Sequence, residues 1–127
     1  MKQEVKTDKA PAAIGPYSQA VKAGGMVFVS GQIPLNPDSG ELISGDIQAA
    51  TRQVLENLQA ILHEAGCGLD KVVKVSVFLQ DMADFQKVNE VYGEFFDQTP
   101  PARVCIQVAG LPKGAPVEME AVALLQT

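Results

Sequence analysis

One arginine and two carboxylates near the end of the chain form a pattern that could hold an anionic ligand and handle a proton. Period-two alternation places Arg103, Cys105 and Gln107 on one face of an apolar segment. After a turn rich in glycine and proline, Glu118 and Glu120 share one face of the returning segment. A guanidinium offers two parallel donors to a carboxylate ligand, and a nearby carboxylate suits proton transfer. The sequence therefore predicts a site for a small carboxylic acid.

Each of these residues also has a purely structural interpretation. Arg103 could form an internal salt bridge to Glu120 or to another acid, and Glu118 could be a solvated carboxylate on an edge strand. Residues 30–31 could be an ordinary strand end, and Tyr17 an ordinary loop aromatic. Spacing alone leaves both interpretations open.

Composition restricts the class of protein. The 127 residues, 46% of them apolar and 20% charged, predict a single globular domain spanning 1–127. A net charge of −5, with no basic cluster interleaved with aromatics, argues against a nucleic-acid partner. No apolar run is long enough to span a bilayer, and the charged start of the chain lacks the apolar centre of a signal peptide. We expect a cytoplasmic protein.

Cysteine and histidine usage predicts neither a disulfide nor a metal site. Cys67 and Cys105 are far apart, and neither belongs to a CxxC pair. His63 stands on a predicted helix, where we expect a partly exposed side chain rather than a catalytic base.

Apolar periodicity predicts the elements that must position the site. Asp46 to Ala65 has helical spacing, with Ser44 or Asp46 as the N-cap and Gly66 as the stop. The other predicted elements are a hairpin of 20–23 and 26–30, a loop over 31–40, a strand over 72–79 with Val73, Val75, Val77 and Leu79 on one face, a helix from Asp81 to a stop at 99–101, two final strands, and a short strand at 4–5. This order predicts an α+β fold with two helices on one face of a mixed sheet.

The last two strands are expected to pair as a hairpin. If Ala109 pairs with Val117, Arg103 and Glu118 lie about five residues, or roughly 16 Å, apart along the ladder. Either the register is bulged, or different copies of the chain supply the two groups. We favour the second alternative, which predicts a symmetric oligomer with pockets at its interfaces.

The sheet face away from the helices supports the same expectation. We expect Cys105, Val122 and Leu124 there beside the charged groups, as an exposed apolar strip of the kind that forms subunit interfaces. A semi-polar face in contact with solvent is the alternative.

Ordered matches through almost the whole chain resemble the Rid family, the reactive intermediate deaminases or YjgF-type proteins. They are 10–20 (APAAIGPYSQA), 30–34 (SGQIP), 40–41 (GE), 57–58 (NL), 75–78 (VSVF), Phe85, Asn89, 95–96 (FF), 101–103 (PAR), 111–115 (LPKGA) and 117–121 (VEMEA). Several long matches in order are far more specific than one short motif.

The resemblance implies a chorismate-mutase-like fold of the bacillar type, assembled as a homotrimer with a central β-barrel and active clefts between subunits. It implies hydrolysis of enamines and imines such as 2-aminoacrylate, which pyridoxal-phosphate enzymes release, to 2-keto acids and ammonia. It implies no cofactor and no metal.

The resemblance also assigns roles to residues. Arg103 would grip the substrate carboxylate with support from the Cys105 backbone N–H, and Glu118 would position the attacking water. Tyr17, Ser30 and Gly31 would line the pocket, and Asn89 would have a smaller role. Val104 stands where the family often has serine, and by alternation it faces away from Arg103.

Two other functions are compatible with this pattern. A non-catalytic module could bind 2-keto acids or small amino acids in the same pocket. A ribonuclease or translation inhibitor fits less well, because the chain is acidic and its sequence predicts no basic groove.

Overall fold

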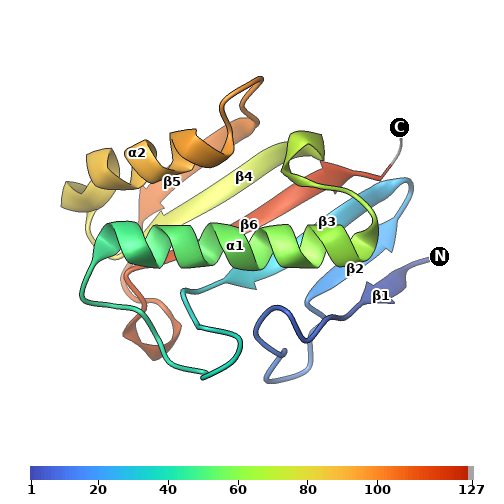
Figure 1. Ribbon diagram of the computed structural model, residues 1–127, viewed down its shortest axis with the longest axis horizontal. Coiled ribbons are helices and arrows are strands. Elements are labelled where there is room, and N and C mark those ends of the chain that lie inside the picture. Colours follow the sequence, from blue (N-terminus) through green and yellow to red (C-terminus); the bar gives the residue numbers. More distant parts are fainter. Residues whose placement is uncertain (126–127) are drawn as a thin grey trace.

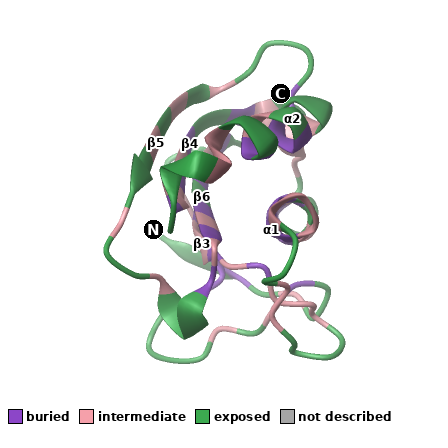
Figure 2. Ribbon diagram, turned by 90° about the vertical axis from the view of Figure 1, so that its left-hand side faces the viewer, coloured by how far each residue is buried: buried purple, intermediate pink, exposed green. Residues whose placement is uncertain are grey.

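The structure, a computed structural model, describes residues 1–125 as one mixed sheet and two helices (Figure 1). The strands are β1 (Gln3–Val5), β2 (Ala20–Ala23), β3 (Met26–Gln32), β4 (Val72–Leu79), β5 (Ala102–Gln107) and β6 (Val117–Leu124); the helices are α1 (Ile47–Ala65) and α2 (Phe85–Phe95). In the sheet, the order is β1-β2-β3-β6-β4-β5, with β4 and β5 parallel and the other neighbours antiparallel. Both helices cover the same face (Figure 2), so the predicted α+β class and element order are confirmed.

The first helix follows its sequence signals closely. The Asp46 side chain accepts hydrogen bonds from the backbone N–H groups of Gln48 and Ala49, as an N-cap does. Gly66 ends α1 in the left-handed region at φ 99°, which glycine enters without strain. His63 is exposed on this helix, as expected. Neither helix of the described chain has the length and apolar composition needed to cross a membrane.

Two predicted boundaries differ from the structure. β3 continues through Gly31 and Gln32, which were expected in a loop. The second helix begins at Phe85, because Asp81 caps a separate 3-10 turn over Met82–Asp84. Prolines and capping residues mark the neighbourhood of an element's end more reliably than its last residue.

The core lies between the two helices and the sheet face that they cover (Figure 2). On β6 the alternate residues Val117, Met119, Ala121 and Ala123 are at most 3% exposed. On β4 the buried set is Val72, Val75, Val77 and Leu79. The prediction that Val73 joins this face is wrong, because the register shifts between Val72 and Lys74 and leaves Val73 exposed.

The predicted hairpin between the last two strands is also wrong. β5 pairs in parallel with β4, while β6 lies between β3 and β4. A helical crossover such as α2 returns the chain parallel to the strand it left, so it places β5 beside β4. The segment 108–116 then carries the chain past β4 to the centre of the sheet. The 16 Å estimate, which assumed the hairpin, does not hold.

The sheet face away from the helices, called here the open face, exposes apolar side chains. Its apolar members are Phe28, Phe78, Val104, Ile106, Val122 and Leu124, of which Phe28, Val104, Ile106 and Leu124 are each more than 40% exposed. Val122 and Leu124 were expected here. The expectation that Cys105 joins them is wrong: the β4–β5 register places Arg103 opposite Val75 and Cys105 opposite Val77, both buried under the helices.

Candidate active site

The guanidinium of Arg103 is held by one face of α2. The Asn89 side-chain oxygen accepts a hydrogen bond from Arg103 at 2.8 Å. The guanidinium carbon lies 4.8 Å from the centre of the Tyr92 ring and 5.6 Å from that of Phe85. Residues 85, 89 and 92 share one side of the helix because they are spaced four and three apart. Three side chains of α2 thus contact one arginine.

Arg103 has no acidic partner among residues 1–125, where the one ion pair joins Arg52 to Glu94. The internal salt bridge considered from the sequence is therefore not formed. Asn89 occupies one of five N–H donors of the guanidinium, and no other described side chain accepts from it. A positive charge with free donors is suited to a carboxylate ligand.

The backbone beside Arg103 offers another donor. β5 is the last strand of the sheet, and the Val108 N–H donates to the Leu79 carbonyl of β4. Successive N–H groups point to opposite sides of a strand, so the N–H groups of Arg103 and Cys105 point away from β4 to the free edge. The Cys105 thiol is half-buried, and burial raises its pKa. Its backbone, and not a reactive thiolate, therefore suits an anion.

Glu118 lies on β6, in the middle of the sheet, and not on an edge strand. It pairs with Phe78 and points to the open face, opposite to its neighbours Val117 and Met119. The carboxylate lies against the backbone of Gly31: a Cβ built on that glycine would be 3.0 Å from Cδ and 3.3 Å from Cγ of Glu118. Burial, and then the nearby Glu120, raise the pKa of Glu118. Such a carboxylate is a stronger base than an ordinary glutamate.

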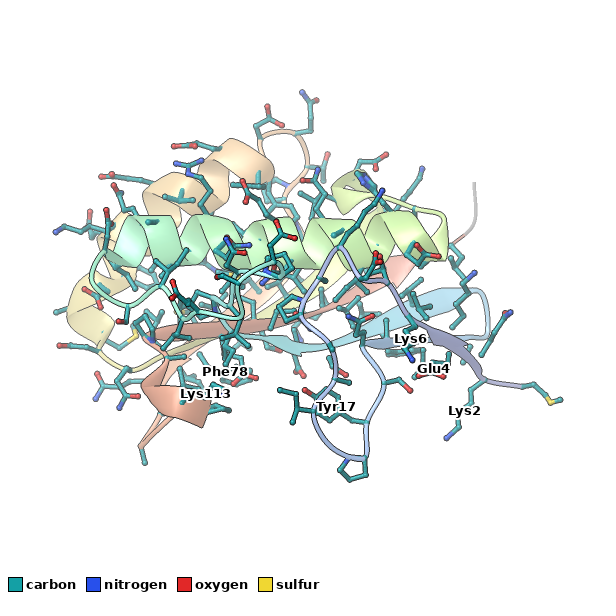
Figure 3. The ribbon with its side chains drawn as sticks, turned by 60° about the horizontal axis from the view of Figure 1, so that its bottom comes forward. Lys2, Glu4, Lys6, Tyr17, Phe78 and Lys113 are labelled. Carbon is teal, nitrogen blue, oxygen red and sulfur yellow. The ribbon has the colours of Figure 1, made fainter. Side chains whose placement is uncertain are left out.

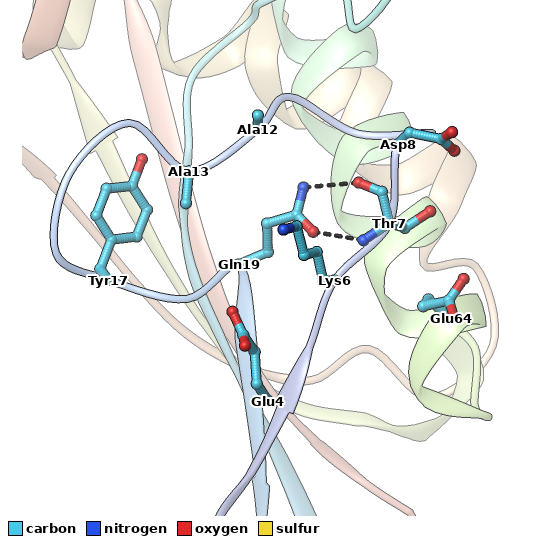
Figure 4. Close-up of a pocket in the computed structure, with 9 residues that line it drawn as sticks. All are labelled: Glu4, Lys6, Thr7, Asp8, Ala12, Ala13, Tyr17, Gln19 and Glu64. Atoms are coloured by element: carbon cyan, nitrogen blue, oxygen red, sulfur yellow. Dashed lines mark hydrogen bonds between the residues drawn. The ribbon is translucent and has the colours of Figure 1, made fainter.

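The loop that carries Tyr17 is anchored by the side chains of Ser30, on β3, and of Gln19, which directly precedes β2. The Ser30 hydroxyl donates to the Ser18 carbonyl at 2.6 Å. Buried Gln19 accepts a hydrogen bond from the Thr7 N–H and donates one to the Thr7 carbonyl (Figure 4). It also donates to the Pro11 carbonyl. Ser30 therefore positions the loop.

Two hollows border this loop. The smaller, of about 220 Å³, lies between Tyr17, Gly31 and Lys113. The larger is an open groove of about 570 Å³ beside the N-terminal segment, lined by Glu4, Lys6, Thr7, Asp8, Ala12, Ala13, Tyr17, Gln19 and Glu64 (Figure 4). Neither hollow is lined by Arg103, and the smaller one adjoins the backbone that contacts Glu118.

The site residues thus form two separate groups within one chain. The arginine half-site consists of Arg103, the Cys105 N–H and Asn89, on the helix face at the free edge of the sheet. The glutamate half-site consists of Glu118, Gly31, Ser30 and Tyr17, and Tyr17 projects on the side of the sheet away from α1 (Figure 3). The sequence indicated every member of both groups and favoured different copies as the source of Arg103 and Glu118, but it did not indicate that the two groups lie on opposite faces of the sheet.

Sequence reasoning missed three residues that shape these half-sites. Phe85, Tyr92 and Gln19 received no role in the predicted site. The spacing of Phe85, Asn89 and Tyr92 is a helical signal that could have grouped them around one ligand. In the part of the chain that the structure describes, no group of three or more His, Cys, Asp or Glu residues is placed to hold a metal ion.

Comparison with known proteins agrees with this fold. The protein-family description Endoribonuclease L-PSP matches residues 7–125. A 2-iminobutanoate/2-iminopropanoate deaminase of Mus musculus is 48% identical over 124 residues, which cover 98% of this chain and 92% of that protein. A crystal structure from Thermotoga maritima has 54% identity and a TM-score of 0.97, covering 100% of both chains. The structure of E. coli TdcF with bound serine has 47% identity and a TM-score of 0.93, covering 96% of this chain and 98% of that one.

The chain therefore belongs to the RidA/YjgF/L-PSP family, as its sequence resemblance indicated.

Proposed function

We propose that this protein hydrolyses 2-imino acids, and the enamines such as 2-aminoacrylate from which they form, to 2-keto acids and ammonia. The observation that carries the proposal is the unneutralised guanidinium of Arg103 beside the outward N–H of Cys105, both at the free edge of the sheet. Relatives that share about half of this sequence and are named imine deaminases support it, as does the serine bound in a related structure. Serine, like a 2-imino acid, carries a carboxylate next to a nitrogen-bearing carbon.

The active unit in this proposal is a homotrimer of chorismate-mutase-like subunits with a central β-barrel. Each cleft combines the arginine half-site of one subunit with the glutamate half-site of another. The apolar open face supports this assembly, because monomeric proteins rarely expose a large contiguous apolar surface. Light scattering should give a trimer at micromolar concentration, and a stable, active monomer would contradict the assembly.

The chemistry needs little beyond orientation. An iminium carbon is already electrophilic, so the site has to hold the substrate carboxylate and place a water against that carbon. Arg103 and the Cys105 N–H bind the carboxylate. Glu118 accepts a proton as the water oxygen bonds to the carbon, and returns it to the nitrogen. Glu118 then accepts the proton of the new hydroxyl as the carbon–nitrogen bond breaks, which leaves the keto-acid carbonyl and ammonia, and Glu118 passes this proton to solvent. The residues named here need no cofactor or metal for these steps.

The deciding experiment generates 2-aminoacrylate in place, from serine and a pyridoxal-phosphate dehydratase. Semicarbazide traps the imine that remains, and the decrease in trapped imine is measured with and without the protein. We expect the wild type to accelerate hydrolysis and Arg103→Ala to leave the uncatalysed rate. If the wild type binds 2-keto acids but does not change the rate, the protein is the non-catalytic binding module considered as the alternative.

A further inference from the structure

Two properties of Tyr92 bear on how Arg103 is held. Its side chain is 7% exposed, yet its hydroxyl has no hydrogen-bond partner among the described residues. A buried hydroxyl without a partner destabilises a fold, and phenylalanine would fill nearly the same volume without that cost. The ring at the same time lies closer to the Arg103 guanidinium than does the ring of Phe85.

The electron-rich face of an aromatic ring attracts a guanidinium, and the attraction grows when the pair is shielded from water. A flat ring also favours one orientation of the flat guanidinium stacked on it. Asn89 fixes one N–H of Arg103 by a hydrogen bond, which leaves rotation about that bond.

We propose that Tyr92 is a positioning residue that sets the plane of the Arg103 guanidinium through its ring face, and that its hydroxyl is not required for this role. The consequence for catalysis rests on the proposed function, in which Arg103 binds the substrate carboxylate. The positioning of Arg103 itself does not depend on the reaction. Loss of the ring would let the guanidinium rotate and would weaken the grip on any small carboxylate.

Phe96 provides a matched comparison on the same helix end. Its ring centre lies 4.7 Å from that of Tyr92, and it is 8% exposed. No contact joins the Phe96 ring to Arg103 among the described cation–ring pairs. Phe96→Leu should therefore disturb packing to a similar degree without freeing the arginine.

Nuclear magnetic resonance of the arginine side chains tests the proposal directly. The chain has two arginines, so Arg103 and Arg52 give two Nε–H signals, and exposed Arg52 serves as the internal reference. In the wild type we expect the Arg103 Nε–H to have a high order parameter and a chemical shift displaced by the aromatic ring. The order parameter should stay the same in Tyr92→Phe and Phe96→Leu, and it should fall in Tyr92→Leu. A mobile Arg103 in the wild type, or a rigid one in Tyr92→Leu, would overturn the inference. If Tyr92→Leu does not fold, the wild type and Tyr92→Phe keep the inference falsifiable, because a mobile Arg103 in either protein would overturn it.

Binding of pyruvate provides the functional readout. Tyr92→Leu should weaken binding about tenfold, and in the Arg103→Ala background it should have no further effect, because the ring acts through the arginine. In the imine assay, the same variant should raise KM more than it lowers kcat, since a carboxylate grip contributes to ground state and transition state alike. If Tyr92→Leu weakens pyruvate binding equally in the wild type and in the Arg103→Ala background, the role of Tyr92 is merely structural. An inactive wild type with a rigid, ring-shifted Arg103 would refute the proposed function but not this inference.

Discussion

Arg103 and Glu118 lie on opposite faces of the same sheet. Arg103 pairs with Val75 and Glu118 with Phe78, three positions further along β4. Because side chains alternate, an odd separation along β4 places the two groups on different sides. They also lie two strands apart, so their Cα atoms are separated by about 14 Å, from roughly 10 Å along the strands and 9.6 Å across them. One chain therefore cannot bring both groups to one small substrate.

Replacing Arg103 should abolish imine hydrolysis. Arg103→Ala removes charge-assisted hydrogen bonds that contribute about 2–3 kcal/mol to substrate anchoring. Arg103→Lys should remain poor, because an ammonium cannot reproduce the planar pair of donors. Arg52→Ala is the matched control, since it removes the other arginine from an exposed ion pair. Near-normal turnover in either Arg103 variant, at unchanged fold and assembly, would exclude the carboxylate-binding role.

Glu118 and Glu120 should differ in consequence although they share a strand face. Glu118 is half-buried against Gly31, whereas Glu120 is exposed. Glu118→Gln should retain 2-keto acid binding and lose turnover about 10²-fold or more, the usual effect of removing a positioned acid or base. Glu120→Gln should affect assembly or stability more than chemistry. Both variants are compared at equal trimer content, and an inactive Glu120→Gln beside a normal Glu118→Gln would reverse the two roles.

The raised pKa of Glu118 predicts how stability and activity depend on pH. Burial and Glu120 favour the protonated form in the folded state. As pH rises above the ordinary value of 4.5, the unfolded chain loses its proton first, so the stability contributed by protonated Glu118 declines until the folded carboxyl is also ionised. In urea unfolding, the free energy of unfolding of Glu118→Gln relative to that of the wild type should therefore increase as pH rises through this window.

The acid limb of the pH–rate profile for imine hydrolysis should report the ionisation of Glu118. Activity requires ionised Glu118, so this limb should lie above the ordinary glutamate range, and Glu120→Gln should move it to lower pH. A limb that does not move in Glu120→Gln would show that Glu118 is not the titrating base.

Activity should require glycine at position 31, because a side chain there would clash with the Glu118 carboxylate. The backbone of Gly31 does not have a positive φ, so alanine is conformationally acceptable and acts through this contact alone. Gly31→Ala should displace the carboxylate and reduce kcat at least tenfold while the keto-acid affinity changes little. Gly45→Ala is the matched control, since no atom lies within 4 Å of its built Cβ and its φ is not positive. Equal activity of the two variants would mean that Glu118 does not act from this position.

Periodicity predicted the faces of the strands but not their neighbours. The burial of Val117, Met119 and Ala121 follows from alternation, and α1 follows from its cap and its glycine stop. Strand pairing depends on contacts between distant segments, which a local pattern does not encode. The orientation of Arg103 was missed for this reason: the helix face of β5 is defined by its pairing with β4 and by α2 above it.

Mixing two inactive variants should restore activity if each site is shared between subunits. An Arg103→Ala subunit keeps its glutamate half-site, and a Glu118→Gln subunit keeps its arginine half-site. In a mixed trimer one of the three clefts then receives both wild-type groups. Joint refolding of equal amounts should give mixed trimers in about three quarters of the assemblies, and hence about a quarter of the wild-type activity. Arg103→Ala mixed with Arg103→Lys is the control, because no cleft in that mixture regains the guanidinium. Mixed trimers that are demonstrated by native mass spectrometry and remain inactive would refute the shared site.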